Sequence, residues 1–188
     1  TGNPNSGKTT LFNAITGKIE HVGNWPGVTV EKKEGRVKQS LIPKNMGAKA
    51  IALTAVDLPG AYSLAPFTSE ESITSDFVRG EKPEVLINIV DATNLSRSLF
   101  LTTQLLDLGI PVVVAMNKAD LLKKRGISID TKKMSEMLGC PVVPTSSSRN
   151  EGLKELIEKV VRVAGNAPDE AGNAPVQAGM DPEQAGNP

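Results

Sequence analysis

The stretch that decides the fold is Gly2-Asn3-Pro4-Asn5-Ser6-Gly7-Lys8-Thr9, which satisfies the pattern G-x-x-x-x-G-K-[ST] in full. Apolar residues follow at helical spacing, namely Leu11, Phe12 and Ile15. Glycines let the backbone curl until successive N–H groups point inward, and a helix beginning at Lys8 adds the positive end of its dipole. The stretch predicts a loop that binds a polyphosphate; the alternative is a fortuitous glycine-rich turn.

The side chains of this loop have distinct expected roles. Lys8 reaches the β and γ phosphates as a compact positive charge, and the Thr9 hydroxyl is a ligand for Mg²⁺. The full set of expected nucleotide contacts in this segment is Asn3, Asn5, Ser6, Gly7, Lys8, Thr9 and Thr10.

Outward from the loop, apolar strands alternate with amphipathic helices. Residues 85–90, 111–116 and 141–143 are near-continuous aliphatic runs, as expected of strands buried on both faces of a parallel sheet. Thr68 and Glu71 form a candidate capping box that opens a helix. This order predicts a doubly wound α/β fold with a mostly parallel six-stranded sheet, one antiparallel edge strand and helices on both faces.

The segments 28–38 and 50–56 have the composition of strands, with a turn around residues 44–47. We expect them to pair antiparallel at one edge of the sheet. Since the phosphate loop follows Thr1 at once, we expect the chain to begin inside a longer product, just after a strand. The ligand site is expected where the parallel strands end.

A second motif, Asn117-Lys118-Ala119-Asp120, comes directly after the 111–116 strand. A carboxylate at Asp120 can accept from both N1–H and the 2-amino group of guanine, a pattern that adenine lacks. Asn117 would tie this loop to the phosphate loop, and the Lys118 stem would lie over the base. The motif predicts selection of GTP over ATP; an isolated match of this kind could instead be an exposed polar turn.

A serine cluster, Thr145-Ser146-Ser147-Ser148, follows the 141–143 strand and resembles the last nucleotide loop of small GTPases. The Ser147 backbone N–H would touch the guanine oxygen, with Ser146 and Ser148 beside it. An ordinary turn is the alternative, because serine clusters are common in turns.

The segment Asp57-Leu58-Pro59-Gly60 matches the switch pattern D-x-x-G. Asp57 would hold Mg²⁺ through a water, the Gly60 amide would sense the γ-phosphate, and Thr29 would supply a second hydroxyl to Mg²⁺. Thr29 could instead be an ordinary edge-strand residue. Together the motifs predict a Ras-like P-loop GTPase whose catalytic residues are Asn5, Lys8, Thr29 and Gly60. Hydrolysis should be slow, because Ala61 stands where many GTPases carry a water-orienting Gln.

Composition limits the remaining possibilities. The 21 Lys and Arg balance the 21 Asp and Glu, so no overall field attracts nucleic acid. Residues 1–163 are expected to form the GTP-binding domain. Residues 164–188 repeat every seven residues with Gly and Pro, which favours a linker over a coiled coil. Docking of this tail on a neighbouring copy, giving a homo-oligomer, is the alternative.

Several segments resemble the G domain of FeoB-type bacterial ferrous iron transporters, over roughly residues 1–164. The resemblance covers 2–9, Val22-Gly23-Asn24-Trp25-Pro26-Gly27-Val28-Thr29-Val30-Glu31, Asp57-Leu58-Pro59-Gly60-Ala61-Tyr62-Ser63-Leu64, Asp91-Ala92-Thr93-Asn94-Leu95 and Leu101-Thr102-Thr103-Gln104-Leu105. It implies a GTP switch coupled to a membrane permease domain of the same full-length chain, at the cytoplasmic face of the bacterial inner membrane.

The resemblance also implies a K⁺ site. In potassium-responsive relatives, an Asn at the position of Asn5 holds K⁺ together with backbone carbonyls that match Gly23 and Trp25. Such an ion would supply positive charge at the transferring phosphoryl group. Asn5 could instead only stabilise the loop. The chain departs from the family in its tail, which replaces a helical regulatory domain, and in Lys118, where many relatives have a hydrophobic residue.

Two functions follow from these patterns. The first is a GTP-hydrolysing switch, dependent on Mg²⁺ and activated by K⁺, that regulates ferrous iron uptake. The second is a GTPase adaptor for ribosome or protein assembly, against which the neutral charge counts.

Overall fold

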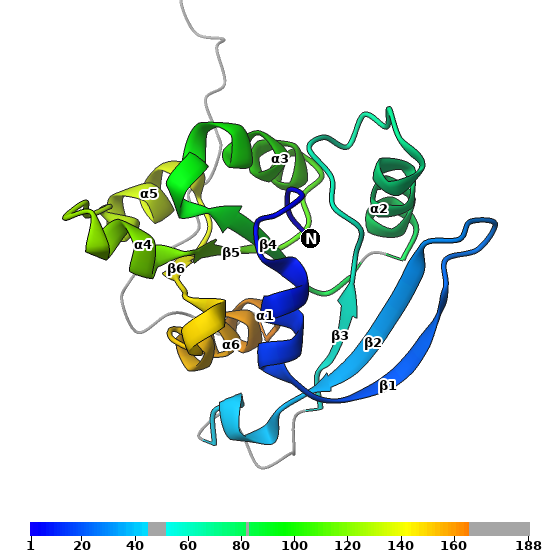
Figure 1. Ribbon diagram of the computed structural model, residues 1–188, viewed down its shortest axis with the longest axis horizontal. Coiled ribbons are helices and arrows are strands. Elements are labelled where there is room, and N and C mark those ends of the chain that lie inside the picture. The colour runs from blue at the N-terminus through cyan, green and yellow to red at the C-terminus, as the bar shows by residue number, and fades with distance from the viewer. Residues whose placement is uncertain (45–51, 82, 166–188) are drawn as a thin grey trace, which may run out of the picture.

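The computed structural model describes residues 1–44, 52–81 and 83–165, with a parallel sheet at its centre (Figure 1). Its strands are β4 (Leu86–Asp91), β5 (Val112–Asn117) and β6 (Val142–Pro144). Each coincides with one of the predicted aliphatic runs. Every residue of β5 is buried, as expected of a central strand covered on both faces.

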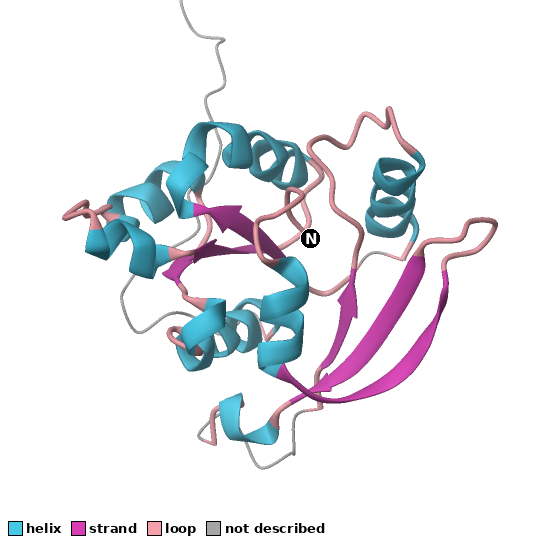
Figure 2. Cartoon of the chain, viewed as in Figure 1, coloured by secondary structure: helices cyan, strands magenta, loops and turns pink. Residues whose placement is uncertain are grey.

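Helices cover both faces of this sheet, as predicted (Figure 2). Successive side chains of β5 point to opposite faces, so the strand contributes to two separate cores. One core joins β5 to α1 (Lys8–Ile15) and α6 (Leu153–Ala164). The other joins it to α3 (Leu95–Asp107) and also takes in α2 (Ser69–Gly80).

Local signals set the ends of these helices. One half of the predicted capping box is present, because Thr68 is the N-cap of α2 and its Oγ1 accepts from the Glu71 N–H at 3.2 Å. Gly139, in the left-handed region at φ 69°, ends α5 (Thr131–Leu138). The remaining helical segments are α4 (Ala119–Lys124) and three short turns, η1 (Gln39–Leu41), η2 (Ala92–Asn94) and η3 (Ser147–Arg149). Within the described ranges, no helix is both long and apolar enough to cross a membrane.

The second sheet differs from the prediction. It is antiparallel throughout and contains β1 (Thr16–Asn24), β2 (Glu31–Val37) and β3 (Thr54–Asp57). The expected antiparallel pairing of the 28–38 and 50–56 segments is confirmed as β2 with β3. However, β1 was not predicted, and the described strands form two sheets of three rather than one six-stranded sheet with a single antiparallel edge.

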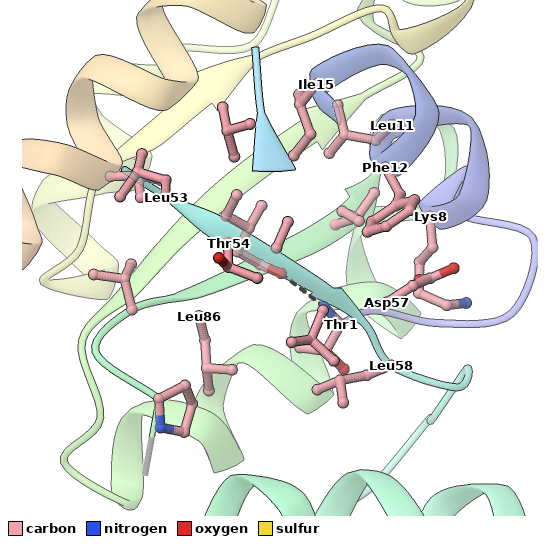
Figure 3. Close-up of a pocket in the computed structure, with 18 of the residues that line it drawn as sticks. Thr1, Lys8, Leu11, Phe12, Ile15, Leu53, Thr54, Asp57, Leu58 and Leu86 are labelled. Atoms are coloured by element: carbon pink, nitrogen blue, oxygen red, sulfur yellow. Dashed lines mark hydrogen bonds between the residues drawn. The ribbon is translucent and has the colours of Figure 1, made fainter. Parts of the chain in front are cut away.

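Contacts of the first two residues explain why β3 and β4 are not neighbours. Thr1 N donates to Ile87 O at 2.9 Å, Ile89 N–H donates to Thr1 O at 2.9 Å, and Gly2 pairs parallel with Ile89. On the other side, Ala61 N–H donates to Gly2 O at 3.2 Å. This segment therefore links β4 to the D-x-x-G segment that follows β3, and beside it lies a mainly apolar cavity of about 280 Å³ (Figure 3).

The predicted division of the chain at residue 163 stays a prediction. Helix α6 ends at Ala164, and the described part ends at Gly165. Residues 166–188, which make up most of the predicted linker, lie outside the described residues, as do residues 45–47 of the predicted turn.

Candidate nucleotide-binding site

The predicted phosphate loop forms between the Gly2 bridge to β4 and the start of α1 at Lys8. Two of its residues adopt the left-handed region, Asn5 at φ 63° and Gly7 at φ 97°. A Cβ on Gly7 would collide with the Asn117 side chain, so this position requires glycine for both its dihedral angle and its neighbour. The curled backbone leaves the N-terminal N–H groups of α1 free of intrahelical partners, which is the geometry that binds phosphate.

Lys8 and Asp57 lie side by side at one end of the cavity in Figure 3. The Lys8 ammonium donates to Asn3 O at 3.3 Å. Burial lowers the pKa of Lys8, and the nearby Asp57 carboxylate opposes that effect. Burial likewise raises the pKa of Asp57, and neighbouring positive charge, including that of Lys8, opposes the rise. An opposite pair is thus held partly desolvated next to the loop, where each charge acts strongly on a ligand.

The D-x-x-G segment also contacts the phosphate loop. A Cβ on Gly60 would come within 3.0 Å of both Lys8 Nζ and Pro4 Cγ, so Gly60 packs directly against the loop. Thr9 and Thr10 are exposed on the first turn of α1, and Asn3 and Ser6 are buried beneath the loop. The Ser6 hydroxyl and the Asn3 amide oxygen are buried without a hydrogen-bond partner in the described part of the chain.

The Asn117 side chain joins three loops. Its amide donates to Ser6 O at 2.9 Å, and its carbonyl oxygen accepts from the Ser147 N–H at 3.0 Å and the Ser147 hydroxyl at 2.8 Å. Asn117 is 3% exposed, so these bonds are shielded from water. The predicted tie between the base-recognition loop and the phosphate loop is present, and it extends to the serine loop.

The guanine-recognising carboxylate predicted at Asp120 lies beside the same serine loop. Its Oδ1 accepts from the Ser146 hydroxyl at 2.9 Å, and its Oδ2 lies 3.4 Å from Arg149 Nε. The Ser146 and Ser148 hydroxyls are 3.5 Å apart. The Ser147 N–H, expected to touch the guanine oxygen, donates to Asn117 in this structure. The elements predicted for base recognition therefore gather at the ends of β5 and β6.

Lys118 occupies the left-handed region at φ 64° and makes two contacts. Its ammonium donates to Asn5 O at 2.9 Å and to Asp91 Oδ2 at 2.6 Å. The side chain thus reaches from the base-recognition loop to the phosphate loop.

The predicted residues of the hairpin lie apart from this cluster. Gly23 is in β1, and Trp25 and Thr29 are in the turn between β1 and β2, because β2 begins only at Glu31. Figure 1 shows the tip of this hairpin well away from the start of α1. Trp25 is buried, with its ring 5.5 Å from that of Phe77 in an edge-to-face contact. Among the described residues, no hydrogen bond joins Asn5 to Gly23, Trp25 or Thr29.

Sequence reasoning assigned no role in the site to three residues that the structure places in it or beside it. Asp91 pairs with Lys118, Arg149 lies beside Asp120, and Glu71 accepts from Tyr62 N–H and Phe67 N–H, both at 3.1 Å. Hydrogen bonds from the backbone, first that of Phe67, hold the pKa of Glu71 below its ordinary value. Asp91 carried a usable signal, since it follows an aliphatic run just as Asn117 does.

A phosphate loop, a D-x-x-G segment against it and a base-recognition motif at the end of the central parallel strand define the chain as a P-loop GTPase fold. A family model described as "Ferrous iron transport protein B" matches residues 1–160. The chain belongs to that family.

Curated relatives include the Fe(2+) transporter FeoB of Salmonella typhimurium, 48% identical over 159 residues, and that of Escherichia coli K12, 46% identical over 169 residues. These matches cover 82% and 88% of this chain but only 19% and 21% of the relatives, so the chain spans about a fifth of their length.

Solved structures of FeoB proteins share the fold. The FeoB G-domain from Methanococcus jannaschii is 40% identical with a TM-score of 0.72, covering 87% of this chain and 94% of that one. An S. thermophilus NFeoB variant bound to GDP is 44% identical with a TM-score of 0.78, covering 89% of this chain and 62% of that one. The predicted fold class and family are thereby confirmed.

Proposed function

We propose that this chain binds and hydrolyses GTP and acts as the switch domain of a ferrous iron transporter. The observation that carries the proposal is the set of hydrogen bonds that the Asn117 side chain donates and accepts, which joins the phosphate loop, the base-recognition loop and the serine loop. The relatives are named as Fe(2+) transporters, and one solved neighbour is bound to GDP.

Guanine recognition is assigned to Asp120, with the Ser147 N–H as the donor to the guanine oxygen and Ser146 and Ser148 as neighbours. Binding of the base requires Asp120 to exchange its contacts with Ser146 and Arg149 for the two N–H donors of guanine. Adenine cannot supply that pair of donors. The carboxylate is therefore the group on which selectivity for GTP depends.

Phosphate binding is assigned to the loop amides and Lys8, with Asn3, Asn5, Ser6, Gly7, Thr9 and Thr10 as the surrounding contacts. The residues present fit Mg²⁺, an ion that prefers oxygen ligands, because the exposed Thr9 hydroxyl can bind it directly and the Asp57 carboxylate can hold it through a water. When bound, Mg²⁺ would neutralise charge on the β and γ phosphate oxygens. Thr29 is the proposed third ligand residue, which requires the hairpin tip to move toward α1.

Hydrolysis is proposed to be slow. Ala61 is fully buried and offers no side-chain group to orient a water. Lys8 and the Gly60 amide would stabilise charge on the γ-phosphate, and both already lie together. Asn5, exposed and in the left-handed region, is the proposed side-chain ligand of K⁺, with the carbonyls of Gly23 and Trp25 completing the site after the hairpin tip moves.

The partner in the proposed switch is the membrane permease domain of a full-length chain, at the cytoplasmic face of the inner membrane. Nucleic acid is not an expected partner, because the net charge is zero. Homo-oligomer formation through the tail remains an alternative to the linker interpretation. The adaptor function keeps the same nucleotide chemistry and differs only in the partner.

Replacement of Asp120 by Asn tests the assignment of the base reader. An amide presents one donor to the purine edge, so preference should move from GTP toward XTP, by about tenfold or more. Competition between GTP and XTP for the purified variant measures this directly. Unchanged preference for GTP would remove Asp120 from base recognition.

A further inference from the structure

Asp91 is the last residue of β4 and faces the base-recognition loop. In the parallel pairing of β4 with β5, Asp91 is the partner of Asn117. Lys118 follows Asn117 directly, so it lies next to the end of β4. The Lys118 ammonium lies 2.6 Å from Asp91 Oδ2. An ion pair therefore joins the ends of two neighbouring strands at the edge of the sheet where the nucleotide motifs gather.

The Asp91 carboxylate is fixed in orientation by its other oxygen. Oδ1 accepts from the Thr93 N–H at 2.9 Å and from the Thr93 hydroxyl at 2.7 Å. Burial alone would raise the pKa of Asp91, but hydrogen bonds from Lys118 and Thr93 hold that pKa below its ordinary value. The Asp91 carboxylate is therefore ionised at neutral pH, and its Oδ2 accepts a hydrogen bond from Lys118.

Lys118 connects the Asp91 carboxylate to the phosphate loop. Its ammonium donates to Asn5 O at 2.9 Å while paired with Asp91, so one cation links the end of β4 to the loop. The side chains of Lys118 and Asp91 are 31% and 18% exposed, which leaves the pair partly shielded from water. An unpaired Lys118 could adopt many rotamers, and most of them would lose the contact with Asn5.

We propose that Asp91 is a positioning residue for nucleotide binding, whose carboxylate holds the Lys118 ammonium on the Asn5 carbonyl and so keeps the base-recognition loop closed on the phosphate loop. The inference rests on the proposed nucleotide binding and deepens it, since it assigns a role to a residue outside the sequence motifs. A purely structural alternative is that Asp91 only caps the η2 turn through Thr93.

A double-mutant cycle separates these two roles. Asp91→Asn retains an oxygen that can accept from Thr93 but removes the charge that holds Lys118, whereas Lys118→Met removes the cation and keeps a long stem. Calorimetric titration of the full chain with GDP and Mg²⁺ should give about three- to tenfold weaker affinity for Asp91→Asn, as expected for a partly exposed charged pair. In the Lys118→Met background, Asp91→Asn should change affinity less than twofold.

Matched controls decide between the outcomes. Asp107→Asn removes an exposed carboxylate on α3 and should leave GDP affinity unchanged. Lys118→Arg, which retains the cation, should recover part of the affinity lost in Lys118→Met. Equal loss from Asp91→Asn in both backgrounds, accompanied by a lower melting temperature, would assign Asp91 to capping and overturn the proposal. Wild-type affinity in Lys118→Met would overturn it even if Asp91→Asn failed to fold.

Failure of the proposed function gives a different result. A wild-type chain that produces no heat with GDP would contradict nucleotide binding itself. A wild-type chain that binds GDP, with Asp91→Asn binding equally well, would contradict only the role of Asp91.

Discussion

The base-recognition side of the site and the hairpin side are assembled to different degrees. At the ends of β5 and β6, buried hydrogen bonds from Asn117 join three loops. On the other side, Thr29 lies in an exposed turn whose neighbours form hydrogen bonds within the hairpin, such as Trp25 N–H to Val30 O at 2.8 Å. The first region is built on a buried parallel sheet, and the second extends from an antiparallel one.

If the chain binds and hydrolyses GTP as proposed, the base-recognition side determines nucleotide affinity and the hairpin side determines the rate of hydrolysis. A preorganised base side loses little conformational entropy when the nucleotide binds. A hairpin tip that must move before its groups reach the phosphates makes hydrolysis conditional on that movement. Substitutions on the two sides should therefore affect different measurements, affinity on one side and turnover on the other.

The largest expected effect is that of Asn117→Ala on affinity. The substitution removes hydrogen bonds to Ser6 and Ser147 and leaves buried groups unpaired, at a cost of about 2–4 kcal/mol. We expect GDP affinity to fall about 100-fold or more. Calorimetry with GDP measures the loss, and a fall of less than about threefold would show that the three loops are not held by Asn117.

Replacement of K⁺ by Na⁺ should affect GTP turnover, which depends on the hairpin side of the site. If Asn5 holds K⁺ after the hairpin tip moves, GTP turnover should slow by about tenfold or more in Na⁺. Asn5→Ala should turn over equally in the two salts. The substitution should keep the contact of residue 5 with Lys118, because that contact uses the main-chain oxygen. A wild-type rate indifferent to the cation would end the K⁺ proposal.

A smaller effect is expected from Glu71→Gln in the first turn of α2, which accepts hydrogen bonds from the loop after Gly60. Glu71 is 6% exposed, and its carboxylate accepts two backbone N–H groups, so the amide should lower stability by about 1–2 kcal/mol at pH 7. Since the folded-state pKa of Glu71 is lowered, this contribution is present above the unfolded pKa of about 4.3 and is lost as pH falls through the folded value.

Thermal unfolding of both proteins between pH 7 and pH 3 tests this linkage. The difference in melting temperature between wild type and Glu71→Gln should shrink on acidification. Glu70→Gln, at an exposed neighbouring position, is the matched control and should show almost no difference in stability. A gap that stays constant down to pH 3 would mean that the Glu71 charge does not stabilise the loop.

The smallest effect is expected from truncation after Val163. The described contacts of the nucleotide site lie in residues 1–151, so GDP affinity should stay within about twofold of the full chain. Melting temperature and GDP titration together measure the outcome. Loss of folding on truncation would refute the interpretation of residues 164–188 as a linker.

Sequence reasoning succeeded where the signal was local. The phosphate loop, the N-cap at Thr68 and the buried run of β5 depend on neighbouring residues, and each formed as predicted. Strand β1 was missed because its sequence, TGKIEHVGN, contains two glycines and two charged residues and has no clear alternation. Its conformation depends on pairing with β2, a tertiary effect that a propensity argument does not include.

The missed side-chain partners have a similar cause. Asp91 contacts Lys118 because β4 and β5 pair in a particular register. Neither segment by itself predicts that register. The placement of Thr29 away from the phosphate loop depends on the direction of the β1–β2 hairpin. The sequence alone can indicate which residues are candidates for the site, but it cannot predict the distances between them.

The most direct test of the account is calorimetric titration of the purified chain with GDP and with ADP in the presence of Mg²⁺. The account predicts heat of binding with GDP and affinity for ADP weaker by about 100-fold or more, since adenine cannot pair with the Asp120 carboxylate. The absence of heat with GDP, or equal affinity for both nucleotides, would contradict it.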